Sequence, residues 1–146
     1  MGVKLGLEAR LYRNTGTFAS PVWNEVKNVR DVTLNLETGE SDVSTRGNGG
    51  WRANISTLKD ASLEFEMMWD TADDDFTALR TAFLTNGSIE FAVLDGASTQ
   101  SGSQGLRATM AIMNFTRTEP LEEAIKVSVT AKPTYATDAP SWMTVA

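Results

Sequence analysis

The sequence has 146 residues, of which 41% are hydrophobic and 22% are charged, values that are ordinary for one folded domain and that exclude the composition of a disordered chain. It contains no Cys and no His, which excludes disulfides, thiolate nucleophiles, Ser-His-Asp triads and metal sites built on these side chains. The formal net charge of −6 and the absence of any run of Lys or Arg argue against a surface that binds nucleic-acid phosphates.

No membrane or export signal is readable in the chain. No stretch approaches the ~18 consecutive apolar residues of a membrane span, and the N-terminus lacks the apolar core of a signal peptide. The opening "MGVKLG" is similar to a myristoylation site, but Gly6 stands where Ser or Thr is required. We therefore expect a protein that has no membrane partner.

Three segments of the first half alternate apolar and polar residues, which is the period of a half-buried strand. The first runs from Lys4 to Arg13, and the second, "VRDVTLNLE", runs from Val29 to Glu37. In the third, from Leu63 to Trp69, the apolar residues interleave with Glu64 and Glu66. We expect three strands, the last of which has one apolar and one largely acidic face.

The period changes to that of a helix at Asp70. The stretch "DTADDDFTALRTAFLTNG" places four apolar residues at helical spacing, namely Phe76, Leu79, Phe83 and Leu84. Asp70 or Thr71 can cap the start, and Asn86 followed by Gly87 suits the end. The sequence therefore predicts one amphipathic helix at about 72–85.

The carboxylates Asp73, Asp74 and Asp75 fall in the first turn of this helix. The helix dipole favours negative charge there, whereas a calcium loop needs ligands that alternate around a glycine turn. We therefore expect these residues to stabilise the helix, and we expect no metal site.

The second half contains three further strand-like segments, at 88–95, 106–118 and 124–132. In the last of them, Lys126 and Lys132 belong to the polar face. Several strands around a single helix predict a mainly β fold, an antiparallel β-sandwich or barrel with the helix over an open edge or end.

The segment beyond Pro133 has no period and contains two aromatic residues. It predicts an extended C-terminal arm, residues 134–146, outside the core. Because Trp is common in interfaces, Trp142 is a candidate residue for docking on a neighbouring chain.

Residues 38–60 show little clear period and predict a long loop. Within it, "STRGNGGWRA" (44–53) places a glycine-rich run before Trp51, which is flanked by two arginines. "RGNGGW" matches neither of the common phosphate-binding glycine motifs, so the choice is between an idle surface loop and an interface anchor. The candidates for contacts between subunits are Arg46, Gly47, Gly49, Gly50, Trp51, Arg52 and Trp142.

Carboxylates are the remaining catalytic option. Glu64 and Glu66 lie about 6.6 Å apart along one strand face, which is the separation of an inverting glycosidase pair, and Glu119, Glu122 and Glu123 form a second acidic cluster. Two neighbours on one strand cannot bracket a scissile bond, and a solvated sheet face accounts for them. We therefore expect no enzyme activity and no cofactor.

An alternative function is a β-sandwich module that binds a carbohydrate or a protein through Trp23, Trp51 or Trp142. Against this alternative, the three tryptophans fall in separate loops or arms and follow no repeated pattern.

Several of these segments together resemble the tail tube (major tail) proteins of tailed bacteriophages. The stretch 22–70 has a leading Trp, the strand "NVRDVTLNLE", a "DVSTR" run, a Gly-Trp after a polar loop and the strand "TLKDASLEFEMMWD". The segments "DDDFTALRTAFLTNGSIEFAVLDG" and "GLRATMAIMNFTRTEPLEEAIKVSVTAKP" are similar to the helix, the following strand and the last pair of strands. The resemblance covers about Val22 to Pro133.

The resemblance implies a structural virion protein of the phage tail, assembled in the host cytoplasm. Its sixfold rings join their inner strands into a continuous β-barrel and stack into a tube that conducts the genome. It further implies a single tail-tube-like domain at 1–133, with an inter-ring loop at 38–60, and a C-terminal arm at 134–146. The expected partners are other copies of the chain, the tape measure, the tail terminator and the distal tail protein.

In such a tube, DNA passes through the lumen without specific binding, which agrees with an acidic subunit. The candidates for the luminal surface are Glu64, Glu66, Lys126 and Lys132. Three questions stay open at this point: which strand face is luminal, whether Trp51 packs in its own subunit or on a neighbour, and whether the tail is contractile.

Overall fold

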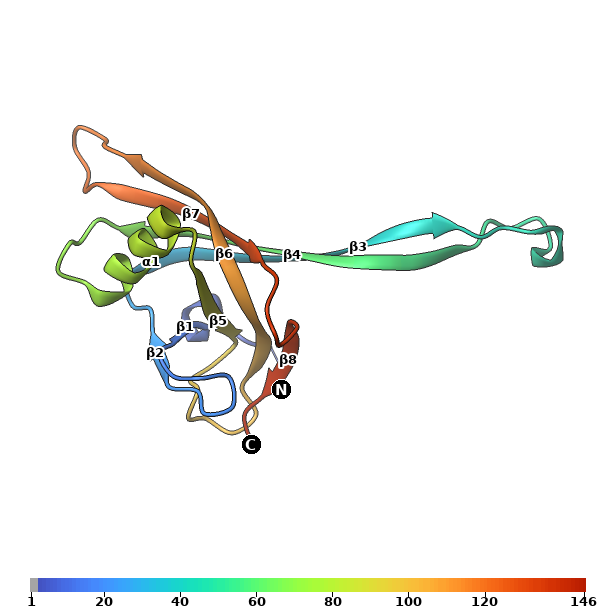
Figure 1. Cartoon of the computed structure of the whole chain (residues 1–146), viewed down its shortest axis with the longest axis horizontal. Helices are drawn as coiled ribbons and strands as arrows, with labels where there is room; N and C mark the ends of the chain where they lie inside the picture. The colour runs from blue at the N-terminus through green and yellow to red at the C-terminus, as the bar shows by residue number, and fades with distance from the viewer. Residues whose placement is uncertain (1–2) are drawn as a thin grey trace.

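A computed structural model describes residues 3–146 as a mainly β fold, with 49% of the chain in strands and one α-helix. The strands form one eight-stranded antiparallel sheet in the order β2-β1-β5-β6-β7-β4-β3, and β8 pairs with β6 (Figure 1). This confirms the predicted class, although the sheet is not closed into a barrel. The elements are η1 (Gly6–Glu8), β1 (Arg10–Asn14), β2 (Trp23–Glu25), β3 (Val29–Asp42), η2 (Arg46–Asn48), β4 (Asn54–Met68), α1 (Asp74–Thr85), β5 (Ser88–Leu94), β6 (Gln104–Thr118), β7 (Lys126–Pro133) and β8 (Ser141–Thr144).

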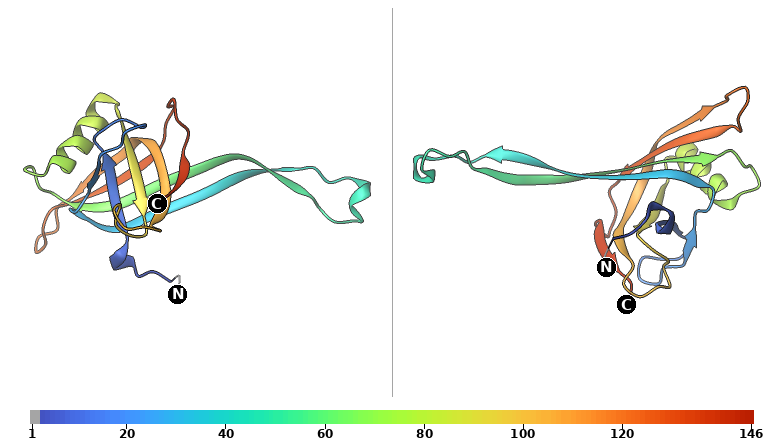
Figure 2. Two further views of the ribbon diagram at one scale, coloured as in Figure 1. Left: turned by 90° about the horizontal axis from the view of Figure 1, so that it is seen from below. Right: turned by 180° about the vertical axis from the view of Figure 1, so that it is seen from behind.

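The long strand β6 joins two parts of the sheet that pack face to face. Its first half pairs with β5 and β8, and its second half pairs with β7. Phe65 of β4 meets Phe91 of β5 edge to face, with ring centroids 6.1 Å apart, and one buried cluster includes both of them with Leu11 of β1. The arrangement is therefore sandwich-like, with its core between the two parts (Figure 2).

The apolar residues of the predicted alternating pattern lie on one face of each strand and fill this core. Leu63, Phe65 and Met67 of β4 are buried and face the core, and so are Val127 and Val129 of β7. Because side chains on a strand point alternately to opposite faces, the residues between them form a separate polar face on the outside of the sheet.

Helix α1 covers the core with Phe76, Leu79 and Ala82, and it begins two residues later than predicted. Asp73 is the N-cap, because its carboxylate accepts a hydrogen bond from the Phe76 backbone N–H at 3.3 Å. Asn86, with a left-handed φ of 57°, ends the helix as predicted.

The three neighbouring aspartates at the start of α1 have separate structural roles. Asp73 is the cap, Asp74 is exposed in the first turn, and Asp75 is buried and pairs with Arg13 of β1 at 2.9 Å. Within the described residues, no group of three or more acidic side chains could hold a metal ion.

The predicted strand from Lys4 to Arg13 is wrong over its first half. Residues Gly6–Glu8 form a 3-10 turn, and β1 begins only at Arg10, where pairing with β5 starts. Leu5 and Leu7 are 67% and 89% exposed. A period-2 pattern produces a strand only where a partner strand is present, and β5 ends at Leu94 opposite Arg10.

The predicted long loop at 38–60 is mostly a β-hairpin. Strands β3 and β4 stay paired from Val29 and Met67 out to Asp42 and Asn54, so the irregular part is only 43–53. We call residues 37–60 the arm; it projects away from the rest of the molecule (Figure 1), and every residue in it is exposed except the half-buried Ala53.

A β-bulge in the arm explains why the sequence shows no regular alternation of apolar and polar residues along these strands. Gly39 of β3 lies opposite two residues, Thr57 and Leu58, so the alternation changes phase at this point. A Cβ atom on Gly39 would lie 2.5 Å from Thr57 Oγ1, so a larger residue at this position would require the Thr57 side chain to shift.

The C-terminal segment 134–146 returns to its own sheet, contrary to the expectation of a segment without regular structure. Ser141–Thr144 forms β8, which pairs antiparallel with β6 and places Trp142 opposite Leu106.

In the residues that the structure describes, no helix is long and apolar enough to cross a membrane.

Candidate assembly surfaces

The tip of the arm, residues 43–53, is a defined turn. The side-chain amide nitrogen Nδ2 of Asn48 donates a hydrogen bond to the backbone carbonyl oxygen of Trp51 at 2.8 Å. The backbone N–H of Trp51 donates to the backbone carbonyl oxygen of Asn48 at 3.1 Å. Gly49 and Gly50 have φ angles of 62° and 83°, in the left-handed region that favours glycine, whereas Gly47 lies in the 3-10 turn η2. Two of the three glycines are therefore explained by the shape of the turn.

The tip presents its large side chains to solvent. Trp51 is 79% exposed, and Arg46 and Arg52 beside it are also exposed. Below the tip, hydrogen bonds from the Ser44 side chain and backbone lower the pKa of Asp42. The structure thus shows that Trp51 does not pack in its own subunit, which was one of the two alternatives left open by the sequence.

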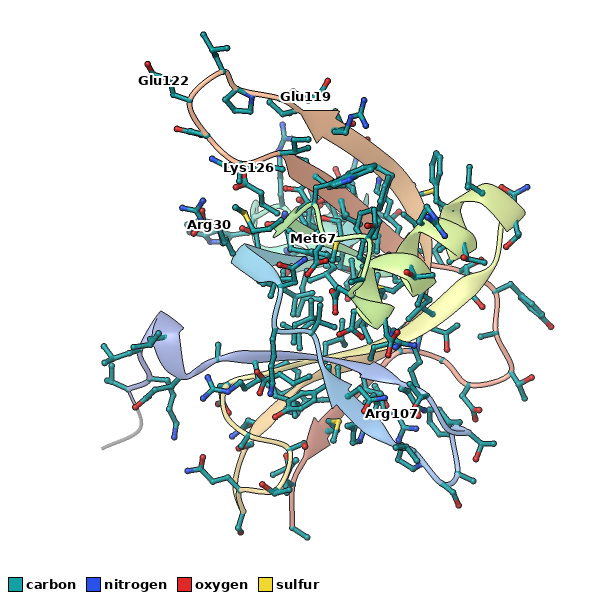
Figure 3. The ribbon with its side chains drawn as sticks, turned by 90° about the vertical axis from the view of Figure 1, so that its left-hand side faces the viewer. Arg30, Met67, Arg107, Glu119, Glu122 and Lys126 are labelled. Atoms are coloured by element: carbon teal, nitrogen blue, oxygen red, sulfur yellow. The ribbon has the colours of Figure 1, made fainter. Side chains whose placement is uncertain are left out.

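Trp142, the other predicted contact residue, is not part of the tip. It lies on β8 beside β6, is 58% exposed, and donates a hydrogen bond from its indole Nε1 to Gln104 Oε1 at 2.9 Å. Trp23 is elsewhere again, with its ring 5.1 Å from the Arg107 guanidinium (Figure 3 labels Arg107). The three tryptophans therefore do not form one binding platform.

The four luminal candidates lie together on the polar face of β4 and β7. Glu64 is opposite Thr130 and Glu66 is opposite Ser128, which places both carboxylates on the same face as Lys126 and Lys132. Through β3 and β6 this surface continues as a four-stranded layer that we call the polar face. Its charged residues are Arg30, Glu37, Asp60, Glu64, Glu66, Lys126 and Lys132.

Several charges of the polar face are paired. Glu66 lies 3.8 Å from Arg30 and 3.9 Å from Lys126, whose positions Figure 3 shows. Lys126 Nζ also lies 2.8 Å from Glu123, and this hydrogen-bonded contact lowers the pKa of Glu123. A face of this kind, open and with its carboxylates next to cations, offers no pair of acids around a bound substrate.

The acidic residues of the β6–β7 turn project at one end of the polar face. Figure 3 shows Glu119 and Glu122 at this turn, and Glu119 lies 3.6 Å from Arg117. Leu121 between them is fully exposed. The predicted second acidic cluster therefore belongs to an open turn.

Two of the four apolar residues that the sequence places at helical spacing in α1 lie on the surface. Phe83 and Leu84 share the helical spacing of Phe76 and Leu79, but Phe83 is 37% exposed and Leu84 is 69% exposed. Leu84 follows Phe83 directly, so one helix face cannot bury both of them. The sequence thus indicated more apolar surface on α1 than its own core can cover.

Comparisons with known proteins find similar structures but no protein that is similar in sequence. No protein-family model matches the sequence, and no curated protein matches it. The structure of the tail of an empty gene transfer agent (GTA) particle, computed with helical refinement and C6 symmetry, is similar at 17% identity and a TM-score of 0.74, over 97% of this chain and 99% of that one. The SPP1 tail tube is similar at 14% identity and a TM-score of 0.68, over 89% of this chain and 75% of that one.

A third solved structure, the baseplate of the anti-feeding prophage, is similar at 9% identity and a TM-score of 0.53, over 94% of this chain and 91% of that one. The GTA match includes nearly the whole chain, so the arm and the body are matched together. This chain therefore has the fold of the GTA tail and of the SPP1 tail tube.

Proposed function

We propose that this protein is a structural subunit of a phage-type tail, in which sixfold rings of the chain stack into a tube that conducts the genome. The observation that carries the proposal is the match to the GTA tail with C6 symmetry over 97% of the chain. An arm that buries nothing in its own subunit supports the proposal, because such a hairpin needs a neighbour to cover it.

The polar face is the proposed luminal surface. It is a continuous layer of four strands on the side opposite to the core, and its four carboxylates outnumber its three cations. Repeated around a channel, an acidic excess repels the DNA phosphates, so the duplex would pass without specific binding. The body of the subunit would then lie on the outside of the tube.

The arm is the proposed connector between rings. Six residues of β3, Glu37 to Asp42, extend the arm by about 20 Å before its tip begins. Trp51, Arg46 and Arg52 at the tip would contact the adjacent ring, since Trp and Arg are among the residues most enriched in interface anchors. The tape measure, tail terminator and distal tail protein would contact the ends of the tube.

Negative-stain electron microscopy of the concentrated protein tests the proposed function. Rings or tubes with a central hole are the expected result. A chain that stays monomeric at every concentration, or monomers that bind glycans, would contradict it.

Labelling of single cysteines tests which face is luminal, because the natural chain has none. Glu64→Cys on the polar face should react with a bulky maleimide in the monomer and be protected in assembled tubes. Asp74→Cys, exposed in the first turn of α1, is the matched control and should react in both states. Equal labelling of Glu64→Cys before and after assembly would reject the assignment.

A further inference from the structure

Both outer edges of the four-stranded layer β6-β7-β4-β3 lack a partner within the described chain over a long stretch. β3 pairs with β4 alone, and residues Ile112–Thr118 of β6 pair with β7 alone, because the pairing with β5 ends at Ala111. Free backbone groups along such edges invite pairing with another strand. The two edges bound the same four-stranded layer, one on each side.

The strand directions of this layer allow a copy to pair with the next copy. The pairs β6–β7, β7–β4 and β4–β3 are all antiparallel, so β6 and β3 run in opposite directions. The β3 edge of one copy therefore meets the β6 edge of the next as a regular antiparallel pair. Repetition of this one head-to-tail contact generates a ring when the rotation between successive copies closes.

Exposed apolar side chains flank the β6 edge. Phe83 of α1 stacks on Phe115 of β6, with ring centroids 6.1 Å apart and an interplanar angle of 23°, yet it remains 37% exposed. Leu84 beside it is 69% exposed. The C-terminal part of α1 thus offers an apolar surface that its own subunit does not cover.

An apolar groove flanks the other edge. A cleft of about 630 Å³ lies between β3 and the segment of η1, β1 and β2, where the sheet fails to close into a barrel. We call it the lateral groove. Its apolar lining consists of Leu7, Ala9, Leu11, Val26, Val29, Val32, Leu34 and Val93, and its charged lining of Arg10, Glu25, Lys27, Arg30 and Asp31.

The two apolar surfaces lie on the same side of the layer. Phe115 is opposite Val129, which is opposite Phe65, so Phe115 points to the core side of the sheet. Leu34 is opposite Leu63, and it points to the same side. Pairing of the β3 and β6 edges therefore brings the end of α1 in one copy next to the lateral groove of its neighbour.

We propose that Phe83 and Leu84 of one copy insert into the lateral groove of the next copy, against Val32 and Leu34. This contact would lock the ring on the outer side of the paired strands. The inference rests on the proposed function, because it names the residues that hold the proposed ring together.

Charge complementarity at one end of the two edges supports the same occupant. At the start of β3 the lateral groove carries a net positive charge, because Lys27 and Arg30 line it together with Asp31. At the same end of the layer, Glu119 follows the last residue of β6, since Thr118 is opposite Lys126 and Lys126 is opposite Met68. Edge-to-edge pairing therefore places a carboxylate of one copy near the net positive end of the groove in the next, which favours this orientation.

Sedimentation velocity of three variants tests the contact. Leu84→Glu removes the inserted side chain and Val32→Glu places a charge in the groove, and both positions are exposed enough in the monomer for the fold to persist, which circular dichroism checks. Each variant alone should stay monomeric under conditions in which the unaltered chain forms rings. Thr85→Glu, also exposed on α1 but turned about 100° around the helix from Leu84 and further from Phe83, is the matched control and should assemble.

Mixing the two defective variants makes the test sharper. A Leu84→Glu chain keeps an intact groove, and a Val32→Glu chain keeps an intact helix end, so a mixture contains one functional combination. The mixture should form heterodimers and nothing larger, because both free ends of each heterodimer are defective.

Assembly of Leu84→Glu or Val32→Glu into rings would overturn this inference and leave the proposed tube intact. A mixture without heterodimers would overturn it as well. A natural chain that never assembles would instead contradict the proposed function, and the inference would fail with it.

Discussion

The two halves of strand β4 differ in what holds them in place. From Ala61 to Met67, every second side chain is buried in the core, whereas from Asn54 to Asp60 every side chain is exposed. Both halves pair with the same partner, β3. Backbone pairing is therefore continuous along the hairpin, while burial stops abruptly at the base of the arm.

This difference separates stability from assembly. A fully buried Phe or Leu side chain contributes about 1.5–3 kcal/mol through burial, and the arm contains none. An isolated two-stranded hairpin is at best marginally stable in water. The body should therefore determine whether the monomer folds, and the arm should determine what the folded monomer can join.

The largest expected effect comes from a matched pair of substitutions within β4. Phe65→Ala should lower the free energy of unfolding by about 3–5 kcal/mol, because Phe65 is 3% exposed and packs against Phe91. Leu58→Ala, at a position that is 86% exposed, should change it by less than about 0.5 kcal/mol. Urea unfolding of the monomer measures both, and similar losses at the two positions would refute the contrast.

A buried ion pair gives the next effect. Arg107 and Glu90 lie 2.7 Å apart with side chains that are only 13% and 9% exposed, so Glu90→Ala leaves a poorly solvated cation and should cost about 3 kcal/mol. The exposed pair of Arg117 and Glu119 is the control, and Glu119→Ala should cost about 0–1 kcal/mol. Equal costs would mean that the Arg107 site is better hydrated than its burial indicates.

The cap of α1 gives a smaller effect in the body. Asp73→Ala should destabilise the monomer by about 1 kcal/mol, because the Phe76 N–H loses its acceptor. Asp73→Asn keeps an acceptor and should recover most of the loss, whereas Asp70→Ala should not reproduce the loss although the sequence also offered Asp70 as a cap. Thermal melts of the three variants distinguish these outcomes.

The sequence predicted those elements whose alternation is enforced by burial. The strands that carry Leu63, Phe91 and Val127, and the polar face with Glu64 and Lys126, follow from one side packed in the core and one side facing solvent, whereas the predicted strand at 29–37 buries no residue and only half-buries Val29 and Leu34. A buried face restricts every second residue to an apolar type, and that restriction is what a period-2 pattern detects.

The elements that the sequence missed lack that restriction. The outer half of the hairpin has two exposed faces and a bulge at Gly39, so no period survives along it. The short strand β8 is set by pairing with β6, which lies far away in sequence. Leu5 and Leu7 show the reverse error, because they alternate without a partner strand. The lateral groove could not be predicted from the sequence either, since residues from β1, β2, β3 and β5 line it together.

The smallest expected effect on the monomer is at the tip of the arm, where the effect on assembly should be large. Trp51→Ala, and separately a deletion of residues 47–50, should leave the free energy of unfolding within about 0.5 kcal/mol of the original, because nothing in the subunit covers the tip. Both should prevent the stacking of rings while single rings still form, since the lateral edges are untouched. Trp51→Phe keeps an aromatic ring and should retain part of the stacking, which separates lost contact area from a disturbed turn. Electron microscopy that shows tubes of normal length with Trp51→Ala would assign ring-to-ring contact to a surface outside the tip, whereas a loss of monomer stability would mean that the arm supports the body after all.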